Sequence, residues 1–441
     1  MELKDKLLSS FMVFEDRVND TTQAVNLNEV RNTAIKTFQQ KGFPTKRDED
    51  WKYTSLNNLL KSDYTIFPQQ ETAIEFKEVK KYFIHDIDTY KVVFIDGKYS
   101  SFLSETTHDG IDVCLMSSAF SKPKYKTVID TYYNKAAKRN SSLASLNTAF
   151  ASEGAYIHIP KNKVVEKPIQ IIHFSTGNEA SLMLQPRNLI VVGENSHVQI
   201  IERHQSLTSN VVFTNSVTEV FADKSAYVDY YKIQNDNEAA SLIDNTFISQ
   251  QQRSNVSVHT FSFGGKLVRN NLQFFQKGER IESTMKGITI IGNKQHVDHN
   301  TLVHHIEPNC ESHQDYKGIF GDRSTGVFNG KVIVEKEAQK TNAFQANNNI
   351  LVDDKATINT KPQLEIFADD VKCSHGCTIG QLDKDALFYL RSRGIPMKEA
   401  KALLMYAFAN NVLESVKISA IKTRINKLIA QKLGVNLGFD L

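Results

Sequence analysis

Two thiols and one imidazole stand at alternating positions near the end of the chain, in the stretch DDVKCSHGCTIG (residues 369–380). Cys373, His375 and Cys377 could form a metal site, a redox pair, a nucleophile with its base, or ordinary core. Thiolate and imidazole are soft or borderline ligands, which suit zinc, Cu(I) and iron–sulfur species. The secondary structure that carries these residues decides between the four possibilities.

The preceding residues, EIFADDVKCS, predict a strand. Side chains alternate along a strand, so the three groups would share one face. Neighbouring groups would then lie about 6.7 Å apart along the strand and the two thiols about 13 Å, too far for a disulfide. One ion could be held by Cys373 with His375, or by His375 with Cys377, but hardly by all three. Such a site lacks two ligands of a tetrahedron, which water, a substrate or another subunit could supply. The alternative, a small buried cysteine beside a hydrogen-bonded histidine, stays open.

A second group of possible ligands lies upstream, in QHVDHNTLVHHIEPNCESHQDYKG. Its spacing matches no metal-ligand template, so we expect these side chains to line strand faces and to satisfy buried polar groups. The group comprises His296, Asp298, His299, His304, His305, Cys310 and His313.

Several motifs are missing. The sequence contains no G-x-x-x-x-G-K-[ST] and no G-x-G-x-x-G, so we expect no nucleotide to be bound by this chain. It also lacks H-E-x-x-H, G-x-S-x-G and C-x-x-C. These absences disfavour an ordinary enzyme of these motif classes.

Composition narrows the class of protein further. The chain has 441 residues, a formal net charge of +3 and four cysteines, the fourth being Cys114, which we expect to be structural. So few thiols exclude a disulfide framework and fit a reducing compartment. The low net charge argues against nucleic-acid binding. We find neither a signal peptide, a typical transit peptide nor an apolar run of transmembrane length, and expect a cytoplasmic protein without membrane contact.

The chain divides into three regions. Residues 1–150 predict helices and mixed structure. Residues 151–368 contain short β-branched and aromatic runs separated by Gly, Asn, Asp and Ser, with Pro308 as the single proline between Arg187 and Lys361. This mainly β pattern allows a sandwich, a propeller or a β-solenoid; its length, and Asn residues near expected turns that could form ladders between stacked coils, favour the solenoid. Residues 369–441 predict a strand followed by helices.

Two features of the C-terminal helices bear on their packing. The helix that Pro396 opens has an apolar stripe, made of Ala400, Leu403, Leu404, Ala407 and Phe408, that we expect to hold the tail together. The last helix has Ile421, Ile425, Leu428 and Ile429 on one face and basic residues on the other. We expect this helix to pack on its neighbours with its charges solvated.

Long motifs resemble a known family. The run TKPQLEIFADDVKCSHGCTIGQLDKDALFYLRSRGI (360–395) is similar to the C-terminal signature of SufD-type subunits in the SufB/SufD family of iron–sulfur cluster assembly proteins. RDEDWKYTSL (47–56) resembles the N-terminal signature of the family, and the similarity spans nearly the whole chain. The C-terminal region resembles the SufB branch less.

The resemblance implies a fold and a role. The fold would be a right-handed parallel β-helix flanked by helical N- and C-terminal regions. The chain would be a scaffold and not an enzyme; it would pair with SufB, bind the SufC ATPase through its C-terminal helices, and share a transient Fe–S cluster with SufB. Alone, its free strand edge should pair with a second copy as a homodimer across residues 310–375. No residue establishes the flavin link of some complexes.

The resemblance also assigns residues. The proposed ligand of the family is the histidine of C-S-H-G, here His375, and we expect Cys373 to contribute more weakly. Cys377 departs from the usual small residue and is either an extra ligand or a harmless core substitution. We expect the charged faces around Arg391, Arg393, Lys398 and Lys401 to carry SufC binding.

Two other functions remain open on the sequence alone. A β-helix enzyme acting on polysaccharide should show an exposed cleft with paired carboxylates along the helix. A purely structural homodimer should leave Cys373 and His375 inert. The fold alone does not separate these from a scaffold.

Overall fold

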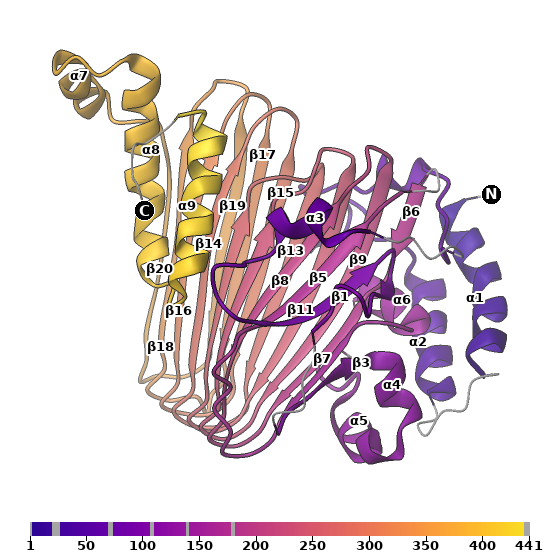
Figure 1. The fold of residues 1–441 in the computed structure, drawn as a ribbon. Coiled ribbons are helices and arrows are strands. Elements are labelled where there is room, and N and C mark those ends of the chain that lie inside the picture. Colours follow the sequence, from indigo (N-terminus) through magenta and orange to yellow (C-terminus); the bar gives the residue numbers. More distant parts are fainter. Residues whose placement is uncertain are drawn as a thin grey trace.

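Two long sheets dominate the computed structural model, which describes residues 2–19, 27–68, 74–105, 110–137, 141–177 and 181–435. Consecutive strands alternate between the sheets, so each coil of the chain adds one strand to each (Figure 1). Except for the antiparallel pairs β1–β2 and β3–β4, neighbouring strands run parallel. This is the predicted mainly β solenoid, and a sandwich of antiparallel sheets is excluded.

Strand order within each sheet follows the stacking of the coils. From one edge to the other, the first sheet contains β2 (Lys98–Tyr99), β1 (Tyr90–Ile95), β5 (Ile169–Ser175), β8 (His197–Ser206), β10 (Tyr227–Gln234), β12 (Asn255–Ser262), β14 (Glu282–Ile291), β16 (Glu311–Phe320), β18 (Asn342–Leu351) and β20 (Lys372–Gly380). The second sheet contains β19 (Thr357–Ile366), β17 (Thr325–Val334), β15 (His296–His305), β13 (Leu267–Gln276), β11 (Ala240–Gln250), β9 (Val211–Ala222), β7 (Arg187–Val192), β4 (Ala155–Ile159) and β3 (Asp112–Leu115), with β6 (Ser181–Leu184) beside β9.

Coil length varies along the solenoid. Tyr227 pairs with Asn255 in one coil, whereas Glu311 pairs with Asn342 in another, so the number of residues in a turn differs. This variation explains why the sequence shows no fixed repeat. Inside, aliphatic side chains from both sheets form one continuous core. Pro362 lies in β19, at the end of its sheet, where a missing N–H costs least.

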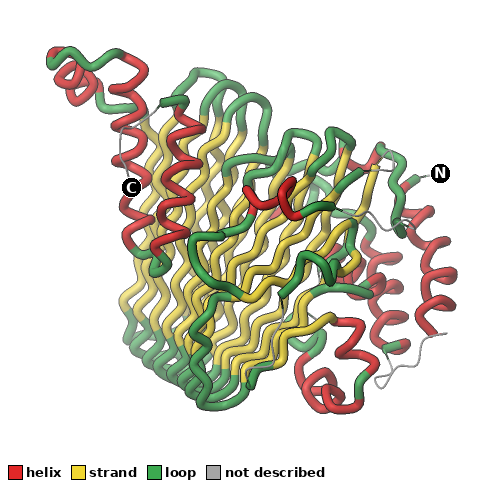
Figure 2. The backbone as a smooth tube through the Cα atoms, viewed as in Figure 1, coloured by secondary structure: helices red, strands yellow, loops and turns green. Residues whose placement is uncertain are grey.

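Helices cover the outer faces of the sheets, with the C-terminal helices at one end of the solenoid and the N-terminal helices at the other, except for α3, which lies over the first sheet (Figures 1 and 2). The N-terminal set is α1 (Leu3–Asn19), α2 (Asn28–Lys41), α3 (Phe76–Val79), α4 (Met116–Ser121), α5 (Lys126–Tyr132) and α6 (Ser142–Phe150). The C-terminal set is α7 (Lys384–Ser392), α8 (Met397–Glu414) and α9 (Ser419–Leu433). None of the helices in the described ranges combines the length and apolar character needed to cross a lipid bilayer.

The cap residues show why the tail divides into separate helices. The Asp383 side chain accepts hydrogen bonds from the backbone N–H groups of Asp385 and Ala386, which fixes the start of α7. Gly394 follows the helix with φ of 86°, a conformation that glycine adopts without strain. As a result α7 projects beyond the body, while α8 and α9 lie against the first sheet (Figure 1).

The predicted apolar stripe of α8 is wrong by about one position. Its buried residues are Ala400, Ala402, Met405, Ala409, Val412 and Leu413, whereas Leu403, Leu404 and Phe408 are half-buried and Ala407 is exposed. The buried face packs on outward side chains of β12, β14 and β16. Because α8 is apolar on several sides, periodicity alone did not show which side meets the sheet. The expected apolar face of α9 is confirmed, since Ile421, Ile425, Leu428 and Ile429 are buried.

The asparagine ladders that we expected between coils occur both at turns and within strands, and at the turns Asn195 donates to Asn162 over 3.0 Å. Asn271 donates to Asn245 over 2.8 Å, and Asn245 donates to Asn215 over 3.3 Å, all within strands. At the turns, asparagine also serves a conformational purpose, because Asn195 and Asn293 hold φ values of 55° and 51°. Asparagine tolerates this left-handed conformation better than most residues.

Candidate functional site

The solenoid ends in two free strands. Strand β20 pairs with β18 on one side, and β19 pairs with β17, and neither has a neighbour on its other side among the described strands. Each therefore presents a row of backbone N–H and C=O groups that no described strand uses. The outer face of β20 is also open, since a Cβ on Gly376 would meet no described atom within 4 Å.

The two cysteines and the histidine of DDVKCSHGCTIG lie on this last strand. Cys373, His375 and Cys377 are in register with Ala343, Gln345 and Asn347 of β18, all three of which are buried. They therefore share the face that lines the interior of the solenoid, as alternation predicts. No further coil follows in the described chain, so this interior face is left open at the end of the stack, and His375 and Cys377 are exposed.

Each of the three groups has a different environment. Cys373 is half-buried beside a small apolar cluster that includes Val332 and Val334, and burial raises the pKa of its thiol. The Cys377 thiol donates a hydrogen bond to Thr360 Oγ1 of β19 over 3.2 Å. His375 has an exposed imidazole. Within the described chain these groups do not gather into one three-ligand cluster. That the three groups cannot all hold one ion stays a prediction.

A buried amide lies beside His375. Gln345 is 3% exposed, and its Nε2 and Oε1 atoms have no hydrogen-bond partner among the described residues. A buried amide without partners is costly, so a polar group brought to this end of the solenoid could gain hydrogen bonds here. The site thus offers soft ligands and free polar atoms together at an incomplete edge.

The upstream histidines are structural, as we expected. His299 contacts Asn270 and Thr289, His305 contacts Ser312 over 2.9 Å, and His304 contacts Glu335 over 2.6 Å. His296 contacts Thr54 over 2.9 Å and His313 stacks on Phe344. Cys310 is buried, and its thiol donates to the Gly278 carbonyl over 3.1 Å. Their partners lie at separate places, so the side chains do not converge.

Cys114 lies away from the free edge. It is half-buried in β3 beside the aromatic residues Tyr125 and Tyr156, and burial raises the pKa of its thiol to about 11. A thiol with so high a pKa forms little thiolate at neutral pH and is a poor nucleophile.

Of the expected partner-binding cations, Arg391 lies on the projecting helix α7, Arg393 follows it, and Lys398 and Lys401 lie in the first turns of α8. Arg391, Arg393 and Lys398 are exposed, and Lys401 is half-buried. Sequence reasoning missed two aromatic side chains on α7, Phe388 and Tyr389, which are 74% and 57% exposed. The signal was present, because neither residue fits the polar exterior of an isolated surface helix.

The N-terminal signature is held against the outer face of the second sheet. The guanidinium of Arg269 lies 3.9 Å from the centre of the Trp51 ring and donates to the Asp50 carbonyl over 2.8 Å. Arg269 also pairs with Asp298 at 2.5 Å. Lys361 of β19 pairs with Glu49. The segment around Trp51 thereby connects the N-terminal helices with the last coil.

Comparisons with known proteins agree with this architecture. Residues 173–408 match the family described as SUF system FeS cluster assembly, SufBD core domain, and residues 1–171 match the SufBD protein N-terminal region. An iron–sulfur cluster assembly SufBD family protein of Synechocystis is 30% identical over 94% of this chain and 92% of its own length. Iron–sulfur cluster assembly protein SufD of Escherichia coli is 29% identical, covering 89% and 90% of the two chains. SufB of Bacillus subtilis is 27% identical over 68% and 64%. The chain therefore belongs to the SufB/SufD family of iron–sulfur cluster assembly proteins, and it is of the SufD type.

Proposed function

We propose that this chain is a scaffold subunit that pairs with SufB, binds the SufC ATPase and helps to hold a nascent iron–sulfur cluster. The observation that carries the proposal is the open end of the solenoid, where the described strands β19 and β20 each have a free edge and Cys373, His375 and Cys377 face the open interior. A second solenoid edge can pair with these strands through backbone hydrogen bonds.

Pairing would complete the ligand set. Two ligands of this chain leave a soft-metal site short of a tetrahedron, and a thiolate from SufB would fill it. His375 is the first candidate because its imidazole is exposed, whereas the half-buried Cys373 forms its thiolate less readily. The cluster is cargo in this account, so the chain needs no catalytic residue of its own. Without SufB, the same edge would pair with a second copy.

The projecting tail is the proposed contact for SufC. Helix α7 carries the exposed aromatic residues Phe388 and Tyr389, and Arg391 and Arg393 follow them. Aromatic and arginine side chains are enriched at interfaces. We place the complex in the cytoplasm.

Co-expression with SufB and SufC tests the pairing and the cargo together. Purification through a tag on this chain should bring both partners, iron and sulfide. The variant His375→Ala should retain SufB and SufC but lose iron and sulfide. Full cluster content in this variant would show that His375 is not needed to hold the cluster. A purified complex that lacks SufB would contradict the proposed pairing.

A matched pair of charge reversals tests the tail. Arg391→Glu on α7 should weaken SufC binding at least about tenfold, since arginine is enriched among the interface hot spots, whose truncation costs about 2 kcal/mol or more. Lys427→Glu on α9, also an exposed reversal, should leave SufC binding unchanged. Equal affinity of the two variants, with α7 still helical by circular dichroism, would place the SufC contact elsewhere.

A further inference from the structure

A second cluster of possible metal ligands lies inside the solenoid, far from the open edge. It consists of His173 on β5 with Glu202 and His204 on β8. Strand β8 is six strands from β20 in the first sheet, which at about 4.8 Å per strand is roughly 29 Å. The cluster is therefore independent of Cys373, His375 and Cys377.

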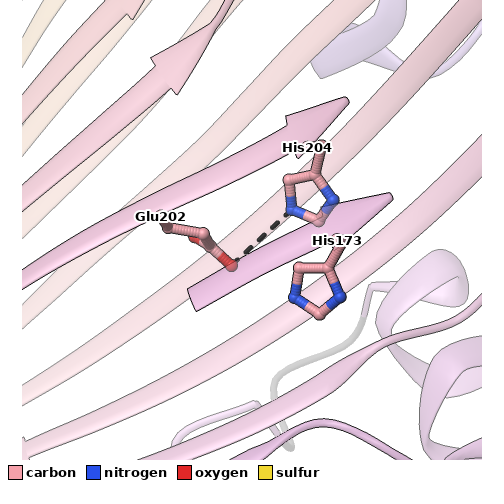
Figure 3. Close-up of side chains that lie close together, drawn as sticks. All are labelled: His173, Glu202 and His204. Carbon is pink, nitrogen blue, oxygen red and sulfur yellow. Dashed lines mark ion pairs between the residues drawn. The ribbon is translucent and has the colours of Figure 1, made fainter. Parts of the chain in front are cut away.

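Strand geometry brings the three ligands together. Glu202 and His204 are two residues apart on one strand and so share a face, and His173 is directly opposite His204 in the register. The interior apolar residues Ile200 and Ile171 precede them on the same faces. One potential ligand atom from each residue lies within 4.8 Å of the other two. Figure 3 shows the two imidazole rings beside each other with the Glu202 carboxylate turned toward His204.

Three of the four imidazole nitrogens in this cluster lack a hydrogen-bond partner among the described residues. His173 and His204 are 5% and 8% exposed, yet His173 Nε2 and both ring nitrogens of His204 have no hydrogen-bond partner among the described residues. His204 Nε2 lies 3.6 Å from Glu202 Oε1, longer than a hydrogen bond. By contrast, both ring nitrogens of the buried His299 have partners, in Asn270 and Thr289.

The distance between these two atoms suits a shared ion. Two ligand atoms bound to one tetrahedral ion at about 2.05 Å are separated by about 3.3 Å, close to the 3.6 Å observed. The rings of His173 and His204 are now stacked, with centroids 4.6 Å apart and planes 7° apart. Rotation of the His173 ring about its χ2 bond would turn Nε2 toward the same point. Phe94, stacked on His173 at 4.9 Å, covers the other side.

The charged groups around Glu202 carry a net negative charge that a cation could balance. Glu202 Oε2 accepts from Tyr230 over 2.7 Å and lies 3.3 Å from Lys232 Nζ. Lys232 is also paired with Asp244 at 2.6 Å. Glu202 and Asp244 together thus share one ammonium, which leaves one negative charge in this group of described residues without a counter-charge. Glu202 Oε1, which accepts from Asn188 over 3.0 Å, faces the histidines.

We infer that His173, Glu202 and His204 bind one divalent first-row transition-metal ion inside the solenoid. Two imidazoles and one carboxylate form a nitrogen and oxygen donor set that suits Fe²⁺, Co²⁺ and Zn²⁺, and leaves positions for water. Calcium and magnesium prefer oxygen ligands and would bind poorly. The ion would give the two imidazoles the partners they lack among the described residues and would tie β5 to β8.

Cobalt binding tests this site separately from the edge site. The measurement uses the full chain carrying Cys373→Ser, His375→Ala and Cys377→Ser, titrated with Co²⁺ and followed by visible d–d absorption. One equivalent should bind. Adding His204→Gln or His173→Gln should weaken binding at least about 100-fold, because a lost direct ligand costs at least as much as a lost supporting contact. Adding His299→Gln, a buried interior histidine with its own partners, should leave binding unchanged.

Two outcomes would overturn the inference. One is the absence of Co²⁺ binding by the triple variant, and the other is equal binding after His204→Gln. If the glutamine variants fail to fold, X-ray absorption at the zinc edge of the zinc-loaded triple variant still tests which side chains bind the ion. It should show nitrogen and oxygen neighbours with imidazole scattering, whereas a shell without imidazole would contradict the assignment.

Discussion

The Cys377 thiol donates a hydrogen bond to Thr360 Oγ1 over 3.2 Å, and this bond links the last strand of one sheet to the last strand of the other. It is a polar contact at the open end of the solenoid, where an apolar core would be exposed to solvent. The contact also places the thiol on the interior face, beside the position where a partner edge would dock.

The four thiols should differ in reactivity. Cys377 is exposed, whereas burial raises the pKa of Cys114 and Cys310 to about 11. Because the thiolate is the nucleophile, Cys377 should be alkylated first and Cys310 last at pH 8. Timed iodoacetamide labelling with peptide mass spectrometry measures the order. Labelling of Cys310 before Cys377 would contradict the described burial.

A buried ion pair between two strands of the second sheet should anchor the N-terminal region, because Glu219 also accepts hydrogen bonds from the backbone N–H groups of Asn134, Ala136 and Ala137. Arg187 and Glu219 are paired at 2.5 Å with both side chains fully buried. Glu219→Gln leaves the Arg187 charge without its partner, so we expect a loss of about 3–5 kcal/mol in the free energy of unfolding. Lys126→Gln breaks the exposed pair with Asp130 and should cost less than about 1 kcal/mol. Urea unfolding compares them, and equal costs would refute the anchoring role.

Buried histidines should make the protein labile in acid. Burial lowers the pKa of His259 and His299 to about 4 and of His305 to about 3, below the usual 6.5. The unfolded state therefore binds more protons below pH 6.5, and stability falls as pH drops from 6.5 through 4. Burial raises the pKa of Glu153 to about 7 and of Asp236 to about 6, which acts in the opposite direction, but the combined histidine shifts are larger.

Circular dichroism at graded pH measures this effect. Unfolding should set in between pH 6.5 and 4, and His305→Gln should move the midpoint to lower pH. Its amide can still contact Ser312, the hydrogen-bond partner of the wild-type imidazole. A wild-type protein equally stable at pH 7 and pH 4 would contradict the prediction.

The packed face of α8 can be tested on a single helix. Val412 is fully buried against the first sheet, whereas Leu404 is half-buried. Val412→Asp buries an unpaired charge and should cost more than about 3 kcal/mol or detach the tail. Leu404→Asp should cost about 1 kcal/mol, since its charge can reach water. Limited proteolysis and thermal unfolding distinguish the two, and a greater effect at Leu404 would reverse the assignment.

The sequence predicts the type of fold well because the signals for a β-solenoid, short strands and turns, lie between residues that are close in the sequence. Short β-branched runs and a near absence of proline are read along the chain, and alternation correctly places Cys373, His375 and Cys377 on one face. The apolar face of α9 is equally local. The buried face of α8 could not be predicted in this way, because the helix is apolar on several sides. Its packing against the sheet determines that Met405 and Val412 are buried.

Contacts between coils were not predictable in the same way. His173 and His204 meet only because the intervening coil has the length that puts them in register. Because coil length varies along the chain, no fixed sequence spacing predicts that His173 and His204 lie side by side. The contact of Trp51 with Arg269 likewise depends on how the N-terminal segment crosses the second sheet. The sequence marks Trp51 as part of a motif without indicating its partner.

The proposed role of the open solenoid edge is to help hold a cluster through His375. The most direct measurement is the iron and sulfide content of anaerobically purified complexes with SufB and SufC. His375→Ala should leave the complex and its stability intact, because a surface substitution usually changes stability by less than about 0.5 kcal/mol. The same variant should lack iron and sulfide, and His313→Ala, an exposed histidine on β16, should retain both. Wild-type cluster content in the His375→Ala complex would contradict the account.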